Sequence, residues 1–321
     1  MRFTKLVLAM MLLAAPAALC AQGAAAPAPA AVQPETTIEA APQDFITPHI
    51  SNSDKLDLPS LSQKENFTYE YQLPHWAPIH IGPLELDLSP TRHVVMIIVA
   101  ALLCMLTLIS AARSQARSAA TGRPPKGLAN AIESMVLYMR NEIIVPNVGH
   151  NGEKFVPFCL SLFFFILFCN LLGLVPYGST ATSSISVNAT LAIISFFVIE
   201  IAGMFALGRG YLNTIFYWPH DMGFAIKAPI TLIMTPVEIM GKFTKPLALT
   251  IRLFANMIAG HVVVLALISI IFTFASWFLM PAPVLAATGI MLLEIFVAFL
   301  QAFVFCLLVA VFIGQIRESA H

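Results

Sequence analysis

The sequence feature that most constrains this chain is a long apolar segment, from Ile230 to Met280, with an arginine, Arg252, near its centre. An arginine at the centre of a membrane helix costs about 2.5–3.5 kcal/mol on insertion scales. Its guanidinium group does not lose its proton in proteins, so the charge persists. Apolar sequence extends well beyond Arg252 on both sides. The arginine therefore needs an anionic partner or water at mid-membrane.

Other polar side chains lie in the same segment and in the last apolar segment: Glu238, Asn256, His261, Glu294 and Gln301. Helical spacing puts Asn256 on the face of Arg252 and His261 on roughly the opposite face. Glu294 and Gln301 share a face of the last segment. A single Gln or Asn in a membrane helix usually holds helices together. Ionisable residues inside a membrane mark ion pathways, so the set as a whole indicates an ion or proton route.

These residues lie in distinctive motifs: Thr244–Ala248 (TKPLA), Leu249–His261 (LTIRLFANMIAGH), Glu294–Phe303 (EIFVAFLQAF), Asn170–Pro176 (NLLGLVP) and Val187–Leu191 (VNATL). The chain, from about Leu73 to its C-terminus, resembles the a subunit of F-type ATP synthase. That subunit is the stator channel that faces the rotating c-ring. An arginine in RLFxN, a polar residue after AG and LQAF on the next helix form a specific pattern.

The resemblance implies that Arg252 is the essential charge facing the c-ring, where it would attract the ionised carboxylate of a ring helix. It would also prevent protons from leaking directly between two half-channels. The other polar residues would line the proton pathway. Some family members carry Glu after AG and His on the last helix, whereas this chain has His261 and Glu294. Because the exchange preserves an acid–imidazole pair, it supports contact between the two side chains.

Composition agrees with a membrane protein, since the chain is 58% hydrophobic and only 11% charged. Its net charge of zero argues against a nucleic-acid partner. The five cysteines show no metal-ligand spacing, and we expect neither a metal nor a cofactor. The spans contain no serine–histidine motif, paired aspartates or HExxH motif, so we do not expect the chain to be an enzyme by itself.

The N-terminal third is predicted to lie outside the cytoplasm. Residues 1–23 are typical of a signal peptide, with Arg2 and Lys5 before an apolar stretch and small residues after it. An uncleaved anchor helix is the alternative. Residues 24–91, rich in alanine and proline and then acidic, predict a flexible periplasmic tether. Residues 92–321 are predicted to form the membrane domain.

The membrane domain is predicted to be all-α, with five membrane-crossing segments: about His93–Ala112, Phe155–Val175, Asn188–Leu207, Ile230–Met280 and Val284–Ile316. An amphipathic helix, Leu128–Val145, is predicted to lie on the membrane surface. Basic residues after the first span predict a cytoplasmic loop, a periplasmic N-terminus and a cytoplasmic C-terminus in a bacterial inner membrane.

The last two crossing segments are predicted to form a long tilted hairpin. The fourth segment is too long for one ordinary span and contains Pro236 and Pro246, which favours a strongly tilted, kinked helix. Pro281 and Pro283 are predicted to mark the turn that follows. Near the inner end of the third span, Glu200 could face a loop or pair with a basic group, and the sequence does not decide.

This topology predicts two proton half-channels. Glu238 lies on the cytoplasmic side of Arg252 and is predicted to take part in the cytoplasmic exit for protons. The alternative is that Glu238 only forms an ion pair with Lys242, one turn further along the helix. His261 and Glu294 fall at similar depth on the periplasmic side, and Gln301 falls near the level of Arg252, where its amide could orient the guanidinium.

We therefore expect a stator subunit that couples proton flow to rotation for ATP synthesis. Its partners would be the c-ring, b-type peripheral stalk subunits, the F1 sector through the stalk, the lipid bilayer and protons. The alternative is a proton-coupled secondary transporter, but the inverted repeat typical of that class is not evident.

Overall fold

The computed structural model describes residues 55–59, 68–75, 79–81, 84–86, 89–121, 127–149, 151–175, 181–214, 224–274 and 280–318. The predicted signal peptide, residues 1–23, and the first part of the predicted tether lie outside these described residues.

The described membrane domain is helical. Its elements are α3 (Arg92–Thr121), α4 (Leu128–Tyr138), the π-helix η1 (Met139–Ile144), α5 (Val145–Val148), η2 (Gly152–Lys154), α6 (Val156–Gly173), η3 (Ala181–Ser183), α7 (Ile185–Leu207), η4 (Gly208–Thr214), α8 (Phe224–Phe274) and α9 (Pro281–Glu318). Among the described residues, five helices are long and apolar enough to cross a membrane, namely α3, α6, α7, α8 and α9. The prediction of an all-α membrane protein with five spans is confirmed.

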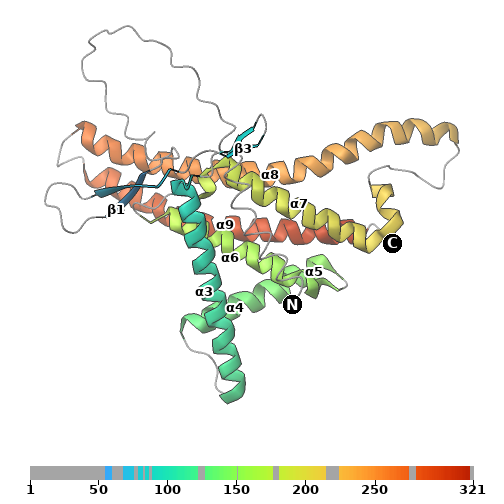
Figure 1. Ribbon diagram of the computed structural model, residues 1–321, viewed down its shortest axis with the longest axis horizontal. Coiled ribbons are helices and arrows are strands. Elements are labelled where there is room, and N and C mark those ends of the chain that lie inside the picture. Colours follow the sequence, from blue (N-terminus) through green and yellow to red (C-terminus); the bar gives the residue numbers. More distant parts are fainter. Residues whose placement is uncertain are drawn as a thin grey trace, which may run out of the picture.

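Helix α8 is continuous although Pro229, Pro236 and Pro246 lie inside it. At a rise of 1.5 Å per residue, it is about 75 Å long, against a hydrocarbon core of about 30 Å. Figure 1 shows that α8 follows a curved course and that α9 lies beside it for much of its length, whereas α3 runs at a steep angle to both. This arrangement is compatible with the tilted hairpin, whose tilt in a membrane stays a prediction.

The last helix begins earlier than predicted. Pro281 and Pro283 do not form a turn ahead of the helix, because α9 starts at Pro281. Proline is tolerated in a first helical turn, where its missing N–H group would have no intrahelical partner. The predicted helix Leu128–Val145 corresponds to α4, η1 and α5, which follow one another without a gap. Its position on a membrane surface stays a prediction.

The core lies where α6 and α9 pack against each other and against α3, α5 and α7. Small residues let these helices approach closely, which favours association between helices in lipid. A Cβ atom at Gly314 of α9 would overlap the main-chain carbonyl of Asn147 in α5. A Cβ atom at Gly203 of α7 would lie 2.7 Å from the Ile316 side chain of α9. α9 is therefore held in place from two sides.

Part of the predicted tether has regular structure. Strand β1 (Lys55–Pro59) pairs with β2 (Thr68–Gln72), and β3 (Ile79–Ile81) pairs with β4 (Leu84–Leu86), both antiparallel. In the strand sequences KLDLP and TYEYQ, polar residues alternate with leucine or tyrosine, which is the period of two that is typical of a strand. The flexibility of the tether stays a prediction.

Candidate functional site

Arg252 lies on the outer face of α8. Leu249, Leu253 and Met257 are spaced four residues apart and are buried against the rest of the protein. Arg252 and Asn256 fall on the adjacent stripe of the same helix and are exposed. Within the described part of the chain, Arg252 makes no hydrogen bond and no ion pair. The guanidinium group and the Asn256 amide are thus presented to whatever covers this face.

The surroundings of Arg252 on this face are apolar. On α8, the exposed residues one turn from Arg252 on its own face are Ala248, Ala255 and Asn256, and Leu247 and Ile251 are exposed further round the helix. The apolar side chains suit lipid or the apolar surface of another membrane helix. The charge of Arg252 suits neither unless an anionic group or water meets it.

Toward the C-terminal end of α8, His261 lies next to Glu294 of α9. The Nδ1 atom of His261 is 3.9 Å from the Oε1 atom of Glu294, and the two side chains are 24% and 15% exposed. On its other side the ring faces α6, where Nε2 lies 3.1 Å from the carbonyl oxygen of Gly173. Because a carbonyl only accepts hydrogen bonds, Nε2 carries the proton of this bond. The α6 carbonyl therefore fixes the ring with Nδ1 toward the carboxylate.

Gly260 makes room for the Glu294 carboxylate. A Cβ atom at this position would overlap the carboxylate oxygen and lie 2.7 Å from its carbon. The carboxylate thus packs directly on the main chain of α8, one residue before His261. Glycine is required here for close approach, because any side chain would displace the acid.

Gln301 of α9 does not lie where it could orient Arg252. Its side chain is 4% exposed, in the interior, whereas Arg252 faces outward. Among the described residues no hydrogen bond joins the two side chains. The structure therefore gives no support to the expectation that the Gln301 amide orients Arg252.

A buried polar cluster, which the sequence did not single out as functional, fixes α9 at the level of Glu294. Thr182 of η3 donates to Oδ1 of Asn170 in α6 (2.8 Å), and Asn188 of α7 donates to the Thr182 carbonyl (2.6 Å). The Asn170 amide donates to the carbonyl of Ala298, one turn after Glu294 (3.3 Å). Asn170, Thr182 and Asn188 are fully buried. The signal was available, since both asparagines lie in motifs quoted above.

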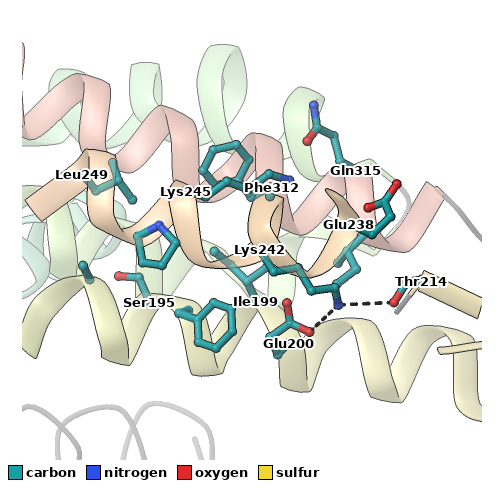
Figure 2. A pocket seen from close by; sticks show the side chains of 15 residues that line it. Ser195, Ile199, Glu200, Thr214, Glu238, Lys242, Lys245, Leu249, Phe312 and Gln315 are labelled. Atoms are coloured by element: carbon teal, nitrogen blue, oxygen red, sulfur yellow. Dashed lines mark hydrogen bonds and ion pairs between the residues drawn. The ribbon is translucent and has the colours of Figure 1, made fainter. Parts of the chain in front are cut away.

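Toward the N-terminal half of α8, a cavity of about 230 Å³ lies between α7, α8 and α9. Its charged lining residues are Glu200, Glu238, Lys242 and Lys245, shown in Figure 2. One water molecule needs roughly 10–15 Å³ of such space and several polar partners. The cavity can therefore hold several water molecules in contact with ionisable groups.

The structure answers the question that the sequence left open about Glu200. The Nζ atom of Lys242 lies 2.9 Å from Oε2 of Glu200, and both side chains are largely buried. Nζ also lies 3.3 Å from the hydroxyl of Thr214 in η4, as the dashed lines in Figure 2 show. Glu200 is thus the partner of a basic group. The alternative pairing of Lys242 with Glu238 is wrong, because Lys242 is engaged across the helix interface.

Tyr211 of η4 completes this contact. Its hydroxyl donates to the Glu200 carboxylate, and Lys242 lies 4.7 Å from the centre of its ring. Burial raises the pKa of Tyr211, and the hydrogen bond and charge of Glu200 raise it further. The phenol therefore remains a protonated donor at neutral pH.

Within the described residues, no group of three His, Cys, Asp or Glu side chains could hold a metal ion.

The fold and these sites define a multi-pass helical membrane protein that keeps ionisable side chains within its helices and presents one arginine on an apolar outer face. Comparison with known sequences gives the particular family. The family model described as ATP synthase A chain matches residues 93–314.

Relatives agree with the family model. ATP synthase subunit a 2 of Chlorobaculum tepidum is 44% identical over 262 residues, which are 80% of this chain and 71% of the relative. ATP synthase subunit a of Chloroherpeton thalassium is 44% identical over 251 residues, 77% of this chain and 73% of the relative. ATP synthase subunit a 2 of Chlorobium luteolum is 41% identical over 317 residues, 96% of this chain and 85% of the relative.

The chain belongs to the ATP synthase A chain family and is a subunit of the membrane sector of ATP synthase. Proton transport and ATP synthesis are therefore the processes in which it takes part, as a multi-pass protein of a bacterial plasma membrane. This finding removes the alternative of a secondary transporter.

Proposed function

We propose that the chain supplies two proton half-channels to the c-ring and couples proton flow to rotation of that ring. The observation that carries this proposal is the exposure of Arg252 on an apolar face of α8. A guanidinium group facing lipid at this depth is costly. A rotor helix that carries a carboxylate would match both the apolar surface and the charge.

The periplasmic half-channel would end at His261 and Glu294. Both groups can exchange protons, they lie side by side, and the Gly173 carbonyl together with Gly260 fixes their positions. Along a straight helix His261 is about 13–14 Å beyond Arg252. A proton arriving at this pair could then pass to a carboxylate of the ring, past the Asn256 amide, which is exposed on the face of Arg252.

The cytoplasmic half-channel would be the cavity between α7, α8 and α9. Glu238 lines it and, along a straight helix, lies about 21 Å from Arg252 on the side opposite to His261. Arg252 thus separates the two polar regions along α8. Because its charge is permanent, it would repel protons that attempt to cross directly. Each charge that crosses a potential of 100 mV supplies about 2.3 kcal/mol.

This proposal places the N-terminus in the periplasm and the C-terminus in the cytoplasm. It also gives the chain the partners expected of a stator: c-ring subunits, b-type peripheral stalk subunits, and the F1 sector through the stalk. Copurification with those subunits, followed by ATP-driven proton pumping in inverted membrane vesicles, tests it. A chain that copurifies but whose site variants all pump normally would contradict the proposed pathway.

Glu238→Gln is expected to slow ATP-driven proton pumping by about tenfold, since proton transfer by a positioned side chain typically contributes about 100-fold or more and cavity water would replace part of it. The complex should still assemble, because Glu238 is exposed and lines a cavity. Glu142→Gln, which changes an exposed carboxylate on η1, is the matched control and should pump normally. Unchanged pumping by Glu238→Gln would remove this residue from the pathway.

Gly260→Ala is expected to reduce pumping by about tenfold, because the new methyl group displaces the Glu294 carboxylate, and a shift of about 1 Å in a reacting group can cost about 100-fold. Gly289→Ala on α9 is the control, since nothing lies within 4 Å of a Cβ atom there. The measurement is pumping rate per assembled complex. Equal rates for the two variants would show that the position of Glu294 is not critical.

A further inference from the structure

Glu238 and Lys242 have the spacing of an ion pair but do not form one. They are four residues apart on α8 with the acid nearer the N-terminus, which is the favourable orientation for such a pair on a helix. In the structure Lys242 instead bonds to Glu200 of α7. In Figure 2 the Glu238 side chain points away from the Lys242 ammonium group. Among the described residues Glu238 makes no hydrogen bond and no ion pair.

Lys242 is held by a complete set of partners. Its ammonium group has three protons, and three oxygen atoms surround it: Glu200 Oε2 at 2.9 Å, Thr214 Oγ1 at 3.3 Å and Tyr211 Oη at 3.4 Å. These partners come from α7 and η4, not from α8. The other cation of the cavity, Lys245, lies 4.6 Å from the ring centre of Phe312 on α9. Neither cation of the cavity is therefore engaged with Glu238.

We propose that Glu200 is a positioning residue whose task is to bind Lys242 and so keep Glu238 available for proton exchange in the cytoplasmic half-channel. This inference rests on the proposed function of Glu238. Without the Glu200 charge, Lys242 has one carboxylate within reach along its own helix face, and that carboxylate is Glu238. A Glu238–Lys242 pair would hold the acid in its ionised form and occupy the group that must take up and release protons.

The charged groups of the cavity are consistent with this division. The α7 side contributes Glu200, with Tyr211 of η4 beside it, and α8 contributes Glu238, Lys242 and Lys245. The α9 side contributes Phe312, Gln315 and Ile316, none of which is charged. Of these two acids and two bases, Glu200 pairs with Lys242, Lys245 lies against the ring of Phe312, and Glu238 is left without a cation. Removing the charge of Glu200 leaves one acid for two bases, which favours capture of Glu238.

The test is ATP-driven proton pumping by assembled complexes that carry Glu200→Gln, Glu200→Gln with Lys242→Met, and Glu238→Gln. Glu200→Gln should slow pumping by about fivefold, which corresponds to about 1 kcal/mol of capture free energy at 1.4 kcal/mol per tenfold. Adding Lys242→Met should restore most of the rate, because no cation remains one turn from Glu238. Lys242→Met would also relieve a purely structural defect, because both partners of the buried pair are then gone. The two roles are therefore separated by the Glu238→Gln background, in which a structural role predicts a further loss of rate from Glu200→Gln.

The control is Glu153→Gln, which breaks an ion pair of similar length, 2.7 Å to Arg140, on the exposed surface and should change nothing. Glu200→Gln should also add no further loss in a Glu238→Gln background, because it acts through that residue. If Glu200→Gln does not assemble, Tyr211→Phe, which removes a hydrogen bond to Glu200, should give a smaller loss that Lys242→Met also reverses.

Each outcome separates the two proposals. Normal pumping by Glu238→Gln would overturn the proposed role of Glu238, and the role of Glu200 with it. Slow pumping by Glu238→Gln together with normal pumping by Glu200→Gln would overturn only the role of Glu200. Failure of Lys242→Met to restore the rate would do the same.

Discussion

Arg252→Ala is expected to abolish ATP-driven proton pumping, with rates at the background of vesicles that lack the subunit. The variant removes the charge at this position, and the other exposed cation on this face of α8, Lys245, lies two turns away against the ring of Phe312, so nothing remains at this level to attract a rotor carboxylate. Assembly should be kept, because Arg252 makes no hydrogen bond or ion pair to other described residues. The measurement is pumping in inverted vesicles, with subunit content determined in parallel.

Arg252→Lys separates charge from geometry. Lysine keeps a positive charge but loses the planar fork that matches a carboxylate, and it can lose its proton when desolvated. We expect severe impairment with some residual pumping. Arg140→Ala is the control, since Arg140 is exposed and pairs with Glu153 on the surface. Coupled pumping at the normal rate by Arg252→Ala would overturn the proposal that this residue faces the rotor.

The five spans could be predicted because each is encoded locally. A run of apolar residues long enough to cross a bilayer is visible without knowledge of its neighbours. The stripe that presents Arg252 and Asn256 follows from helical spacing alone. The direction of the last two helices, deduced from the basic residues of the loops, also predicted that His261 and Glu294 would fall at similar depth. The structure places these side chains 3.9 Å apart.

The interactions that could not be predicted from the sequence depend on contacts between segments that are distant in the chain. The bond between Lys242 and Glu200 spans 42 residues, whereas the rival pairing with Glu238 was local and therefore easier to propose. The bond from Asn170 to Ala298 spans 128 residues. The need for glycine at position 260 appears only when the Glu294 carboxylate is placed against it. The turn propensity of proline also gave a wrong prediction at Pro281, which was expected to mark a turn but is the first residue of α9.

The second large effect is expected at His261 and Glu294. Each single change, His261→Ala or Glu294→Gln, should slow pumping by about 100-fold, the usual contribution of a positioned acid or base. Removing either group also leaves the other largely buried without its neighbour. Assembly should be retained, because the buried cluster of Asn170, Thr182 and Asn188 holds α9 independently of the pair.

The exchange variant, His261→Glu with Glu294→His, tests whether the two residues act as one unit. It restores an acid beside an imidazole, so it should pump faster than His261→Glu or Glu294→His alone. Recovery should be partial for two reasons. The Gly173 carbonyl accepts a bond from His261 that a carboxylate cannot donate, and the space above Gly260 fits the Glu294 carboxylate closely.

The exchange variant and the two corresponding single variants are compared in assembled complexes by pumping rate. Residues in contact are expected to show non-additive effects, and independent sites additive ones. An exchange variant no faster than the slower single variant would remove the main support for direct pairing. Strictly additive losses would place His261 and Glu294 in two separate steps of proton transfer, although they lie within 3.9 Å of each other.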